Sequence, residues 1–227
     1  MLNVKNTIVD RLLSFVAPHL CSGCGRLGNT FCDNCKYNII SEPFSSCIVC
    51  GKPHNMGVCY HHKVAFQQAF IVGERQGELQ RLIGGFKFRN MKESCVPLAE
   101  LLCARLPSLD TTVVLVPVPT IPAHIRERGY DHMTLIAKEL GRLSHRPIHY
   151  LLARDGIAVQ HRAGRIQRFE QAEIAYRIVG AIDPAYTYLL LDDIATTGAT
   201  LLKAAELLSD AGAINIWVAA IARQPLD

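Results

Sequence analysis

Long apolar runs are missing from this sequence. No stretch of the 227 residues approaches the roughly 18 apolar residues that a membrane-spanning helix needs. The segment 8–16 is apolar, but Asp10 and Arg11 interrupt it and no small-residue cleavage site follows, so it is a poor signal peptide. We expect it to form a short amphipathic helix. We expect the protein to be cytoplasmic, with the inner face of the membrane as an alternative location.

A large net charge is also missing, and the distribution of the charge says more than its value of +4. Residues 120–180 hold ten Lys and Arg against six acids, whereas the rest of the chain holds fourteen of each. A polyanionic partner, either a diphosphate or a nucleic acid, fits this basic middle third. An ordinary solvated face carries several such charges as well.

Cysteine is abundant. Nine cysteines without a secretory signal argue against a disulfide framework. Seven of them lie within 39 residues and, with one histidine, form four pairs with the spacing of zinc knuckles. The candidate ligands are Cys21, Cys24, Cys32, Cys35, Cys47, Cys50, Cys59 and His62. The sequence therefore predicts one or two structural Zn²⁺ ions, since no water-activating base lies among the ligands.

The simplest pairing joins the first four ligands in one site and the last four in another. An interleaved pairing is left open, and His61 or His54 could replace His62. We expect residues 1–66 to form an N-terminal helix and a Cys-rich zinc-ribbon module. This segment is too small to fold without a cross-link or a bound metal, so the metal would supply its folding energy.

A second informative stretch begins at residue 186. Its apolar run, 186–191, predicts a strand buried on both faces. Asp192 and Asp193 follow, then a hydroxyl-rich loop and a helix at about 200–211. A helix N-terminus after such a loop presents free backbone N–H groups to an anion, and Gly198 has no Cβ to keep a phosphate away. The alternative is a plain turn whose acids and threonines only complement the helix end.

This stretch resembles the phosphoribosyl-diphosphate (PRPP) loop of the type I phosphoribosyltransferases. The resemblance implies that Asp192 and Asp193 contact the ribose hydroxyls, with Mg²⁺ bound alongside PRPP. It also implies that the loop wraps the 5′-phosphate. The loop residues are Thr196, Thr197, Gly198, Ala199 and Thr200.

The rest of residues 67–227 alternates between strand and helix patterns, which predicts a parallel sheet flanked by helices. We expect strands at about 70–74, 113–116, 148–152, 186–191 and 214–221, and helices at about 77–84, 93–106 and 132–143. The ligand site should lie at the carboxyl ends of the strands, where Pro119 and Asp192 both fall.

Two further cationic segments are candidates for this site. Arg126 and Arg128 flank a glutamate before a glycine and could clamp a diphosphate, or they could be part of a basic surface loop. Lys87 and Arg89 alternate with aromatics, which suits an exposed edge carrying cations near the site. Solubilising charges are an equally good interpretation of that second pattern.

Four cysteine knuckles before a type I phosphoribosyltransferase-like domain resemble the ComF family of competence-associated proteins, also called GntX-like. The motifs that carry the resemblance include Lys87-Phe88, Val-Pro-Val-Pro at 116–119, Arg126-x-Arg128-Gly129-Tyr130 and the loop at 192–200. The family also carries a Gln, Arg, Asn and aromatic pattern. Gln160, Arg168, Gln171 and Tyr176 fall at its spacings.

This chain departs from the family pattern at three places. Asp131-His132 stands where the family has Asn-Gln, Gln171 where it has Asn, and His62 where it has Cys. An added carboxylate at Asp131 weakens diphosphate binding unless a cation bridges the two.

The resemblance implies a protein of natural transformation that handles incoming single-stranded DNA in the cytoplasm. PRPP, a phosphate or a DNA backbone group would bind at the loop, and a competence helicase or uptake-channel protein would be the partner. Candidate DNA-binding residues are Arg154, Gln160, Arg165 and Arg168. With 7% aromatics, stacking on bases would be limited.

Two other functions are weighed against this one. An active phosphoribosyltransferase would use the same acids, loop and Mg²⁺ on a nucleobase-like acceptor, with Arg126 and Arg128 stabilising the departing diphosphate. No base-reading constellation is evident within residues 154–176. A retained ligand sensor with a zinc module for protein docking is the third possibility.

Overall fold

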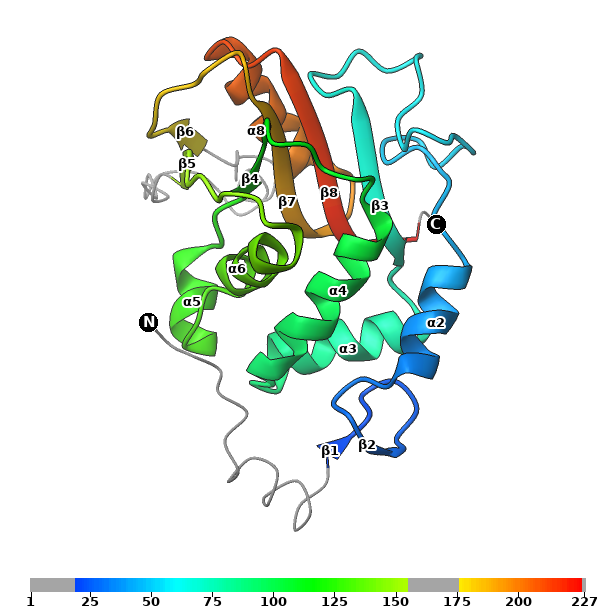
Figure 1. Cartoon of the computed structure of the whole chain (residues 1–227). Helices are drawn as coiled ribbons and strands as arrows, with labels where there is room; N and C mark the ends of the chain where they lie inside the picture. The colour runs from blue at the N-terminus through cyan, green and yellow to red at the C-terminus, as the bar shows by residue number, and fades with distance from the viewer. Residues whose placement is uncertain (1–18, 155–175, 226–227) are drawn as a thin grey trace, which may run out of the picture.

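The apolar runs in the second part of the chain form one parallel sheet (Figure 1). In this computed structural model, residues 19–154 and 176–225 are described. The four strands are β3 (Gln68–Glu74), β4 (Val113–Pro117), β7 (Thr187–Ala195) and β8 (Asn215–Arg223), in the order β3-β8-β7-β4. Every neighbouring pair is parallel, which confirms the predicted parallel sheet.

The register brings the carboxyl ends of β4 and β7 together. Pro117 is opposite Leu191, and the N–H of Val118 donates to the carbonyl of Leu191 at 2.9 Å. The side chains of β4 are buried throughout, as are those of β7 from Tyr188 to Leu191. Polar side chains begin where β7 emerges from the core, so the sheet positions Asp192 and Asp193 at its carboxyl edge.

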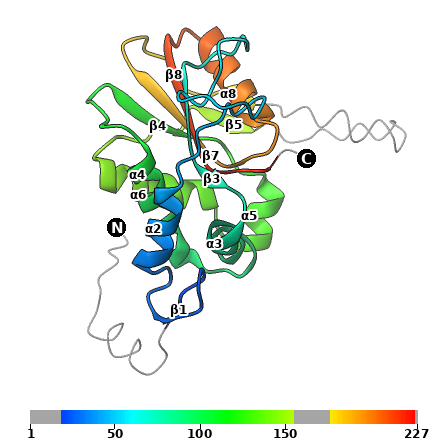
Figure 2. The ribbon, with the colours of Figure 1, turned by 90° about the vertical axis from the view of Figure 1, so that its right-hand side faces the viewer.

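Helices cover both faces of this sheet, as Figures 1 and 2 show from two directions. The helices α3 (Gly77–Phe88), α4 (Cys95–Arg105) and α6 (His132–Ser144) pack on one face, together with the 3-10 turn η1 (Lys92–Ser94). Helix α8 (Ala199–Asp210) packs on the other face. A sheet buried on both faces explains why its strands are continuous apolar runs without alternation.

Two short helices do not follow from the sequence pattern: α2 (Asp33–Ser41), in the cysteine-rich segment, and α5 (Pro122–Arg128). Helix α5 begins with a proline in its first turn and ends at Gly129, which has φ +74°. Proline near the start and a left-handed glycine after the end are ordinary helix boundary signals. The apolar residues of this segment are too few to show a helical period in the sequence.

Two predicted elements differ in the structure. Residues 86–88, expected in an exposed edge, form the last turn of helix α3, and Arg89 is its C-cap. The strand expected at 148–152 is reduced to a single parallel bridge between Ile148 and Leu115. Because Pro147 has no N–H, it cannot extend that ladder. The chain instead forms β5 (Leu152–Arg154), which pairs antiparallel with β6 (Tyr176–Ile178).

The cysteine-rich segment has little regular structure. It contains the short antiparallel strands β1 (His19–Leu20) and β2 (Leu27–Gly28) and the helix α2 (Asp33–Ser41). The helix expected at 8–16 lies outside the described residues. The domain boundary after residue 66 stays a prediction. No helix within the described ranges is long and apolar enough to cross a membrane.

Candidate functional site

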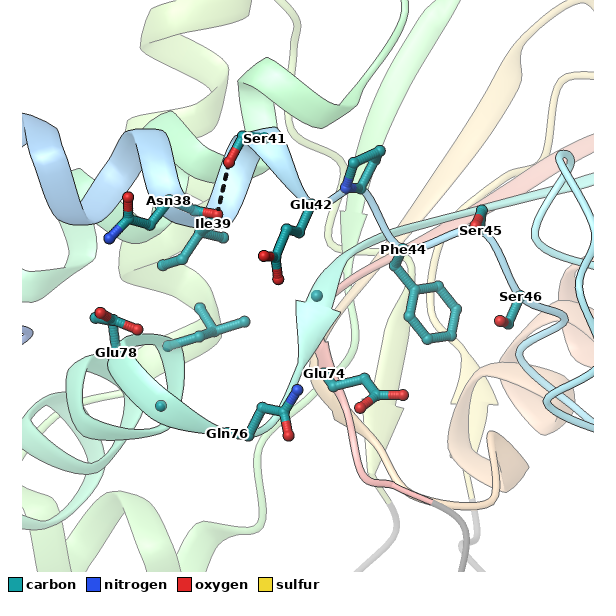
Figure 3. A pocket seen from close by; sticks show the side chains of 14 residues that line it. Asn38, Ile39, Ser41, Glu42, Phe44, Ser45, Ser46, Glu74, Gln76 and Glu78 are labelled. Atoms are coloured by element: carbon teal, nitrogen blue, oxygen red, sulfur yellow. Dashed lines mark hydrogen bonds between the residues drawn. The ribbon is translucent and has the colours of Figure 1, made fainter.

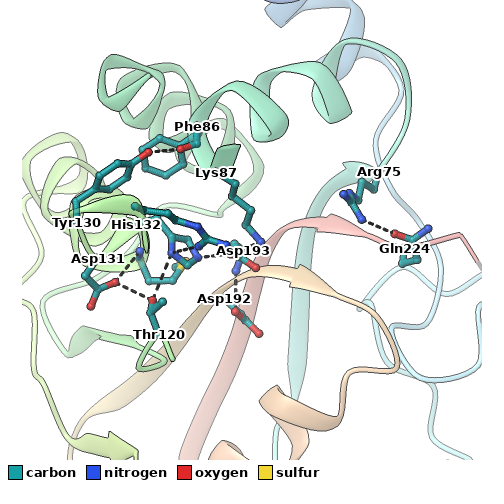
Figure 4. Close-up of polar contacts among 12 residues, drawn as sticks. Arg75, Phe86, Lys87, Thr120, Tyr130, Asp131, His132, Asp192, Asp193 and Gln224 are labelled. Carbon is teal, nitrogen blue, oxygen red and sulfur yellow. Dashed lines mark hydrogen bonds and ion pairs between the residues drawn. The ribbon is translucent and has the colours of Figure 1, made fainter. Parts of the chain in front are cut away.

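The acid pair lies at the end of β7, with side chains from two other elements directed at it (Figure 4). Strand β7 runs on through both acids to Ala195, whereas the sequence analysis ended it at Leu191. The strand pairing of Asp192 with Ala220 continues the ladder to β8. The acids therefore stand on a rigid strand end rather than in a loop.

Asp193 is held by two side chains from the same face of the sheet. The Nζ of Lys87, in the last turn of α3, lies 2.6 Å from Asp193 Oδ2. His132, the first residue of α6, makes a hydrogen bond through Nε2 to the same oxygen. Burial alone would raise the pKa of Asp193, but the bond with His132 and the charge of Lys87 outweigh it and hold the pKa well below its usual range.

Asp192 has the opposite character. Its Oδ1 accepts a hydrogen bond from the N–H of Asp193 at 2.8 Å. Burial, then the charge of Asp193, raise the pKa of Asp192 to about 7, against the opposing charges of Lys87 and Arg154. The pKa values of these two adjacent carboxyl groups are thus shifted in opposite directions. Asp193 stays ionised, and Asp192 gains and loses its proton near neutral pH.

The loop after the acids has the conformation needed at a helix N-terminus. Gly198 is the N-cap of α8 and has φ +75°, a left-handed conformation that favours glycine. Its carbonyl accepts from the N–H of Leu202 at 2.9 Å, which starts the helix. Thr196 and Thr197 are exposed, and the Oγ1 of Thr197 accepts from the N–H of Ala199 at 3.3 Å. A helix N-terminus with exposed hydroxyls beside it suits a phosphate group.

The structure separates the two arginines of the predicted clamp. Arg128 is half-buried, and its Nη1 lies 3.1 Å from His132 Nδ1. Arg126 is exposed and makes no hydrogen bond or ion pair with the described residues. Residues two apart on a helix point in different directions, so only Arg128 is joined to the acid pair.

Asp131 has a structural role that its departure from the family pattern did not reveal. It is the N-cap of α6, where it accepts from the N–H groups of Met133 at 3.1 Å and Thr134 at 3.2 Å. The hydroxyl of Thr120 also donates to Asp131, at 2.8 Å. Its carboxylate is therefore occupied by local donors. His132, in the second altered position, is the residue that reaches Asp193.

The predicted DNA-binding residues are only partly described. Arg154, at the end of β5, lies over the ring of Tyr176 at 5.4 Å and near enough to Asp192 to lower its pKa. Gln160, Arg165 and Arg168 fall outside the described residues.

Sequence reasoning missed Arg223. It ends β8 directly opposite Ala195, and its side chain is only 3% exposed. Its Nε donates to the carbonyl of Ile48 at 3.0 Å, and its Nη2 has no hydrogen-bond partner among the described residues. A buried cation is costly unless an anion compensates it. An isolated arginine in an apolar strand gives no motif, so only the register could reveal it.

The eight metal-ligand candidates form two clusters in the described part of the chain. Cys21, Cys24, Cys32 and Cys35 form one; Cys47, Cys50, Cys59 and His62 form the other, with all ligand atoms of each within 4.8 Å of one another. This is the sequential pairing. Neighbouring sulfurs lie 3.7 to 3.8 Å apart. A tetrahedral zinc with Zn–S bonds of about 2.3 Å holds its sulfurs roughly 3.8 Å apart, so both clusters fit zinc.

A separate acidic pocket contains neither the acid pair nor the loop 196–200. It has a volume of about 700 Å³, between α2, the end of β3 and the start of α3 (Figure 3). Glu42, Glu74 and Glu78 line it, and Arg105 is the cation that holds the neighbouring Phe44 carbonyl. Three carboxylates make this pocket unsuitable for a phosphate.

The parallel sheet with helices on both faces, and the cysteine clusters before it, define an α/β protein with a zinc-ribbon-like module. No protein-family model matches the chain. It is 26% identical over 219 residues to Competence protein F of Haemophilus influenzae, covering 86% of this chain and 91% of that protein. It is 24% identical over 193 residues to Competence protein ComFC of Bacillus subtilis, covering 80% and 78%.

These matches confirm the resemblance to the ComF competence proteins. Among solved structures, a hypoxanthine phosphoribosyltransferase from Staphylococcus aureus is 16% identical with a TM-score of 0.35. That match covers 60% of this chain and 65% of the other, slightly under two thirds of it.

Proposed function

We propose that this protein is a competence-associated protein of natural transformation that handles incoming single-stranded DNA in the cytoplasm. The observation that carries the proposal is the similarity to two competence proteins over 86% and 80% of the chain. A similarity over most of the chain is stronger support than a shared loop motif would be.

In this proposal, the loop at 196–200 binds a phosphate, either the 5′-phosphate of PRPP or a DNA backbone group. Support comes from the helix N-terminus at Gly198 and from the exposed hydroxyls beside it. Lys87 and Arg128 add positive charge next to the acid pair. Arg126 and Arg154, together with the predicted DNA-binding residues Arg165 and Arg168, would attract the rest of the DNA strand electrostatically.

The two acids would have different roles. Asp193 is already bound by Lys87 and His132, so it would position these two side chains. Asp192, which accepts only a backbone hydrogen bond among the described contacts, would meet the ribose hydroxyls. Mg²⁺ bound with PRPP would be held by the Asp192 carboxylate, since oxygen ligands suit this ion. The zinc ions would be structural and would stabilise the N-terminal module.

DNA binding is tested by titrating a fluorescent single-stranded oligonucleotide at several salt concentrations. For each phosphate contact, log K changes with log salt by a slope of about −0.7 on single strands. Arg128→Met should lower the affinity and reduce this slope by about one contact. Arg142→Met is the matched control, because Arg142 is an exposed arginine on α6 paired with Glu139. Equal salt slopes for Arg128→Met and Arg142→Met would contradict the proposal that Arg128 contacts a DNA phosphate.

The biological role needs a separate test in the host. A strain that lacks the gene should lose natural transformation, and the wild-type gene should restore it. A copy with Arg128→Met should restore it less well than one with Arg142→Met. Normal transformation in the strain without the gene would contradict the proposal.

An active phosphoribosyltransferase is the second candidate, favoured by the geometry of the acid pair. Asp193 is engaged by Lys87 and His132, whereas Asp192 accepts only a backbone hydrogen bond among the described contacts. Burial and the charge of Asp193 raise the pKa of Asp192, which suits a proton acceptor. In such a reaction the bond from the ribose C1′ to diphosphate breaks, and a bond from C1′ to the acceptor nitrogen forms. Asp192 would take the acceptor's proton. Diphosphate release from PRPP in a screen of nucleobase-like acceptors tests it, with Asp192→Asn expected to abolish turnover.

A further inference from the structure

A pocket of about 290 Å³ opens beside the acid pair, at the end of α3. Its volume is at the lower end of small-molecule pockets, roughly 300–1,000 Å³. It therefore suits one planar ring better than an extended ligand. The residues that line it are Lys87, Phe88, Asn90, Glu127, Arg128 and Tyr130.

An exposed aromatic ring forms part of this pocket. Phe88 is 69% exposed, although Phe86, two residues earlier on the same helix, is only 1% exposed. The guanidinium carbon of Arg128 lies 5.7 Å from the centroid of the Phe88 ring. A cation over one part of an open ring leaves a surface on which another flat π-system can stack, and arginine itself stacks on such systems.

The same pocket offers groups that can bind the edge of a heterocycle. Asn90 supplies an amide that both donates and accepts, and Glu127 supplies an exposed carboxylate that accepts. Asn90 has φ +55°, a left-handed conformation that ends the turn after α3 and places its side chain at this pocket. A carboxylate here disfavours a second phosphate and favours a ligand with N–H groups.

Two of the lining side chains connect the pocket to the acid pair. Lys87 reaches Asp193 at 2.6 Å, and Arg128 reaches His132, which bonds to Asp193. The pocket and the acid pair are therefore neighbouring subsites with shared cations. A nucleotide would place its flat base in the pocket, its ribose at the acid pair and its phosphate on the loop that follows the pair.

We propose that this pocket binds one nucleobase, stacked on Phe88 and Arg128, from a nucleotide whose phosphate lies on the loop 196–200 that follows the acid pair. The inference rests on the proposed function, because it gives that function a base-binding subsite that no motif in the sequence indicated. The base comes from a single-stranded DNA or from a free nucleotide, and both present the same chemistry.

Base stacking is separated from backbone binding by comparing a thymidine homopolymer with an abasic strand of the same length. Stacking on one aromatic ring changes affinity by about fivefold to a hundredfold. Phe88→Ala should therefore weaken homopolymer binding by that factor and leave abasic binding unchanged, and Phe88→Trp should retain the affinity. Tyr37→Ala is the matched control, since Tyr37 is 71% exposed on α2.

Each outcome decides the inference. Equal losses with both strands, or no loss with Phe88→Ala, overturn it while leaving the DNA-binding proposal intact. If the wild type binds neither strand, the DNA-binding proposal fails, and thymidine monophosphate becomes the deciding probe. Weaker binding of this nucleotide to Phe88→Ala, with inorganic phosphate unaffected, then supports the base subsite, and equal binding rejects it.

Discussion

The two cysteine clusters share their ligand spacing but not their surroundings. The first cluster, Cys21 to Cys35, contributes to the hydrophobic core that contains the helices α3 and α4. The second, Cys47 to His62, contributes to the core on the opposite face of the sheet, where α8 lies. Similar ligand pairs thus contribute to both hydrophobic cores of the protein.

The second cluster also supports the phosphate loop. A Cβ added at Gly198 would lie 3.8 Å from a side-chain carbon of Ile48, the residue between Cys47 and Val49. The carbonyl of Ile48 accepts from Arg223, which pairs with Ala195 at the base of the loop. The first cluster contacts other elements. For example, the Nε of Arg81 on α3 donates a hydrogen bond to the carbonyl of Gly23 at 2.8 Å. The comparison teaches that the second cluster positions the site and the first stabilises the fold.

The largest expected effect comes from removing a metal ligand. Cys35→Ser and Cys59→Ser should each release zinc and lower the melting temperature by many degrees, since zinc binding is folding free energy in such modules. Only Cys59→Ser should also weaken phosphate binding at temperatures where both variants remain folded. Metal content and calorimetry on the same samples measure this. Equal losses of phosphate affinity in Cys35→Ser and Cys59→Ser would contradict the claim that only the second cluster supports the phosphate loop.

The next effect concerns Asp193, which joins β7 to the helices on the face of the first cluster. Asp193→Asn removes the ion-pair partner of Lys87 and should reduce the unfolding free energy by about 3–5 kcal/mol at pH 7. In the wild type this stabilisation is present above the unfolded pKa of about 4 and is lost as the pH falls further, because the folded pKa of Asp193 is lowered.

Asp192→Asn is the matched comparison, with the opposite sign. The folded pKa of Asp192 is raised to about 7, so wild-type stability falls as the pH rises from about 4 to 7. The variant should lack this fall and be more stable than the wild type above pH 7. Urea denaturation over a pH series measures both. A variant of Asp192 that is less stable than the wild type at pH 8 would refute this assignment.

A smaller effect is expected at Arg223. Arg223→Lys removes its bond to the Ile48 carbonyl and should cost about 1–3 kcal/mol, with weaker phosphate binding. Arg105→Lys removes a similar bond to the Ile71 carbonyl, at 3.0 Å, and should cost as much without changing phosphate affinity. Denaturation with phosphate titration distinguishes the two arginines. Unchanged phosphate affinity in Arg223→Lys would show that the second cluster does not support the loop.

The smallest effects concern two glycines. Gly198→Ala should cost about 1–2 kcal/mol, because its φ of +75° is strained for any residue with a Cβ. Gly84→Ala, inside α3 with no atom within 4 Å of the added Cβ, should stabilise by about 0.5–1 kcal/mol. Thermal denaturation measures the change in stability of both variants. A stabilising effect of Gly198→Ala would contradict the left-handed conformation of Gly198.

The sequence predicted the features that short-range patterns encode. Four of the five expected strands and the helix that starts at His132 follow from residue period, and the structure confirms them. The structure also selects the sequential cysteine pairing, which the spacing alone left open. Residues 86–88 were misplaced because a helix end and an alternating strand look alike over four residues. The roles of His132 and Arg223 depend on strand register and helix packing, which bring together residues far apart in sequence.

The most direct test of a phosphate site at the acid pair is calorimetric titration of PRPP with Mg²⁺. It is performed on the wild type and on Asp192→Ala/Asp193→Ala, with and without a short single-stranded oligonucleotide. We predict that PRPP binds the wild type, that the double variant loses this binding, and that the oligonucleotide competes because both ligands bring a phosphate to the same loop. If the wild type binds neither ligand, or the double variant binds PRPP as tightly as the wild type, the site is not the one described.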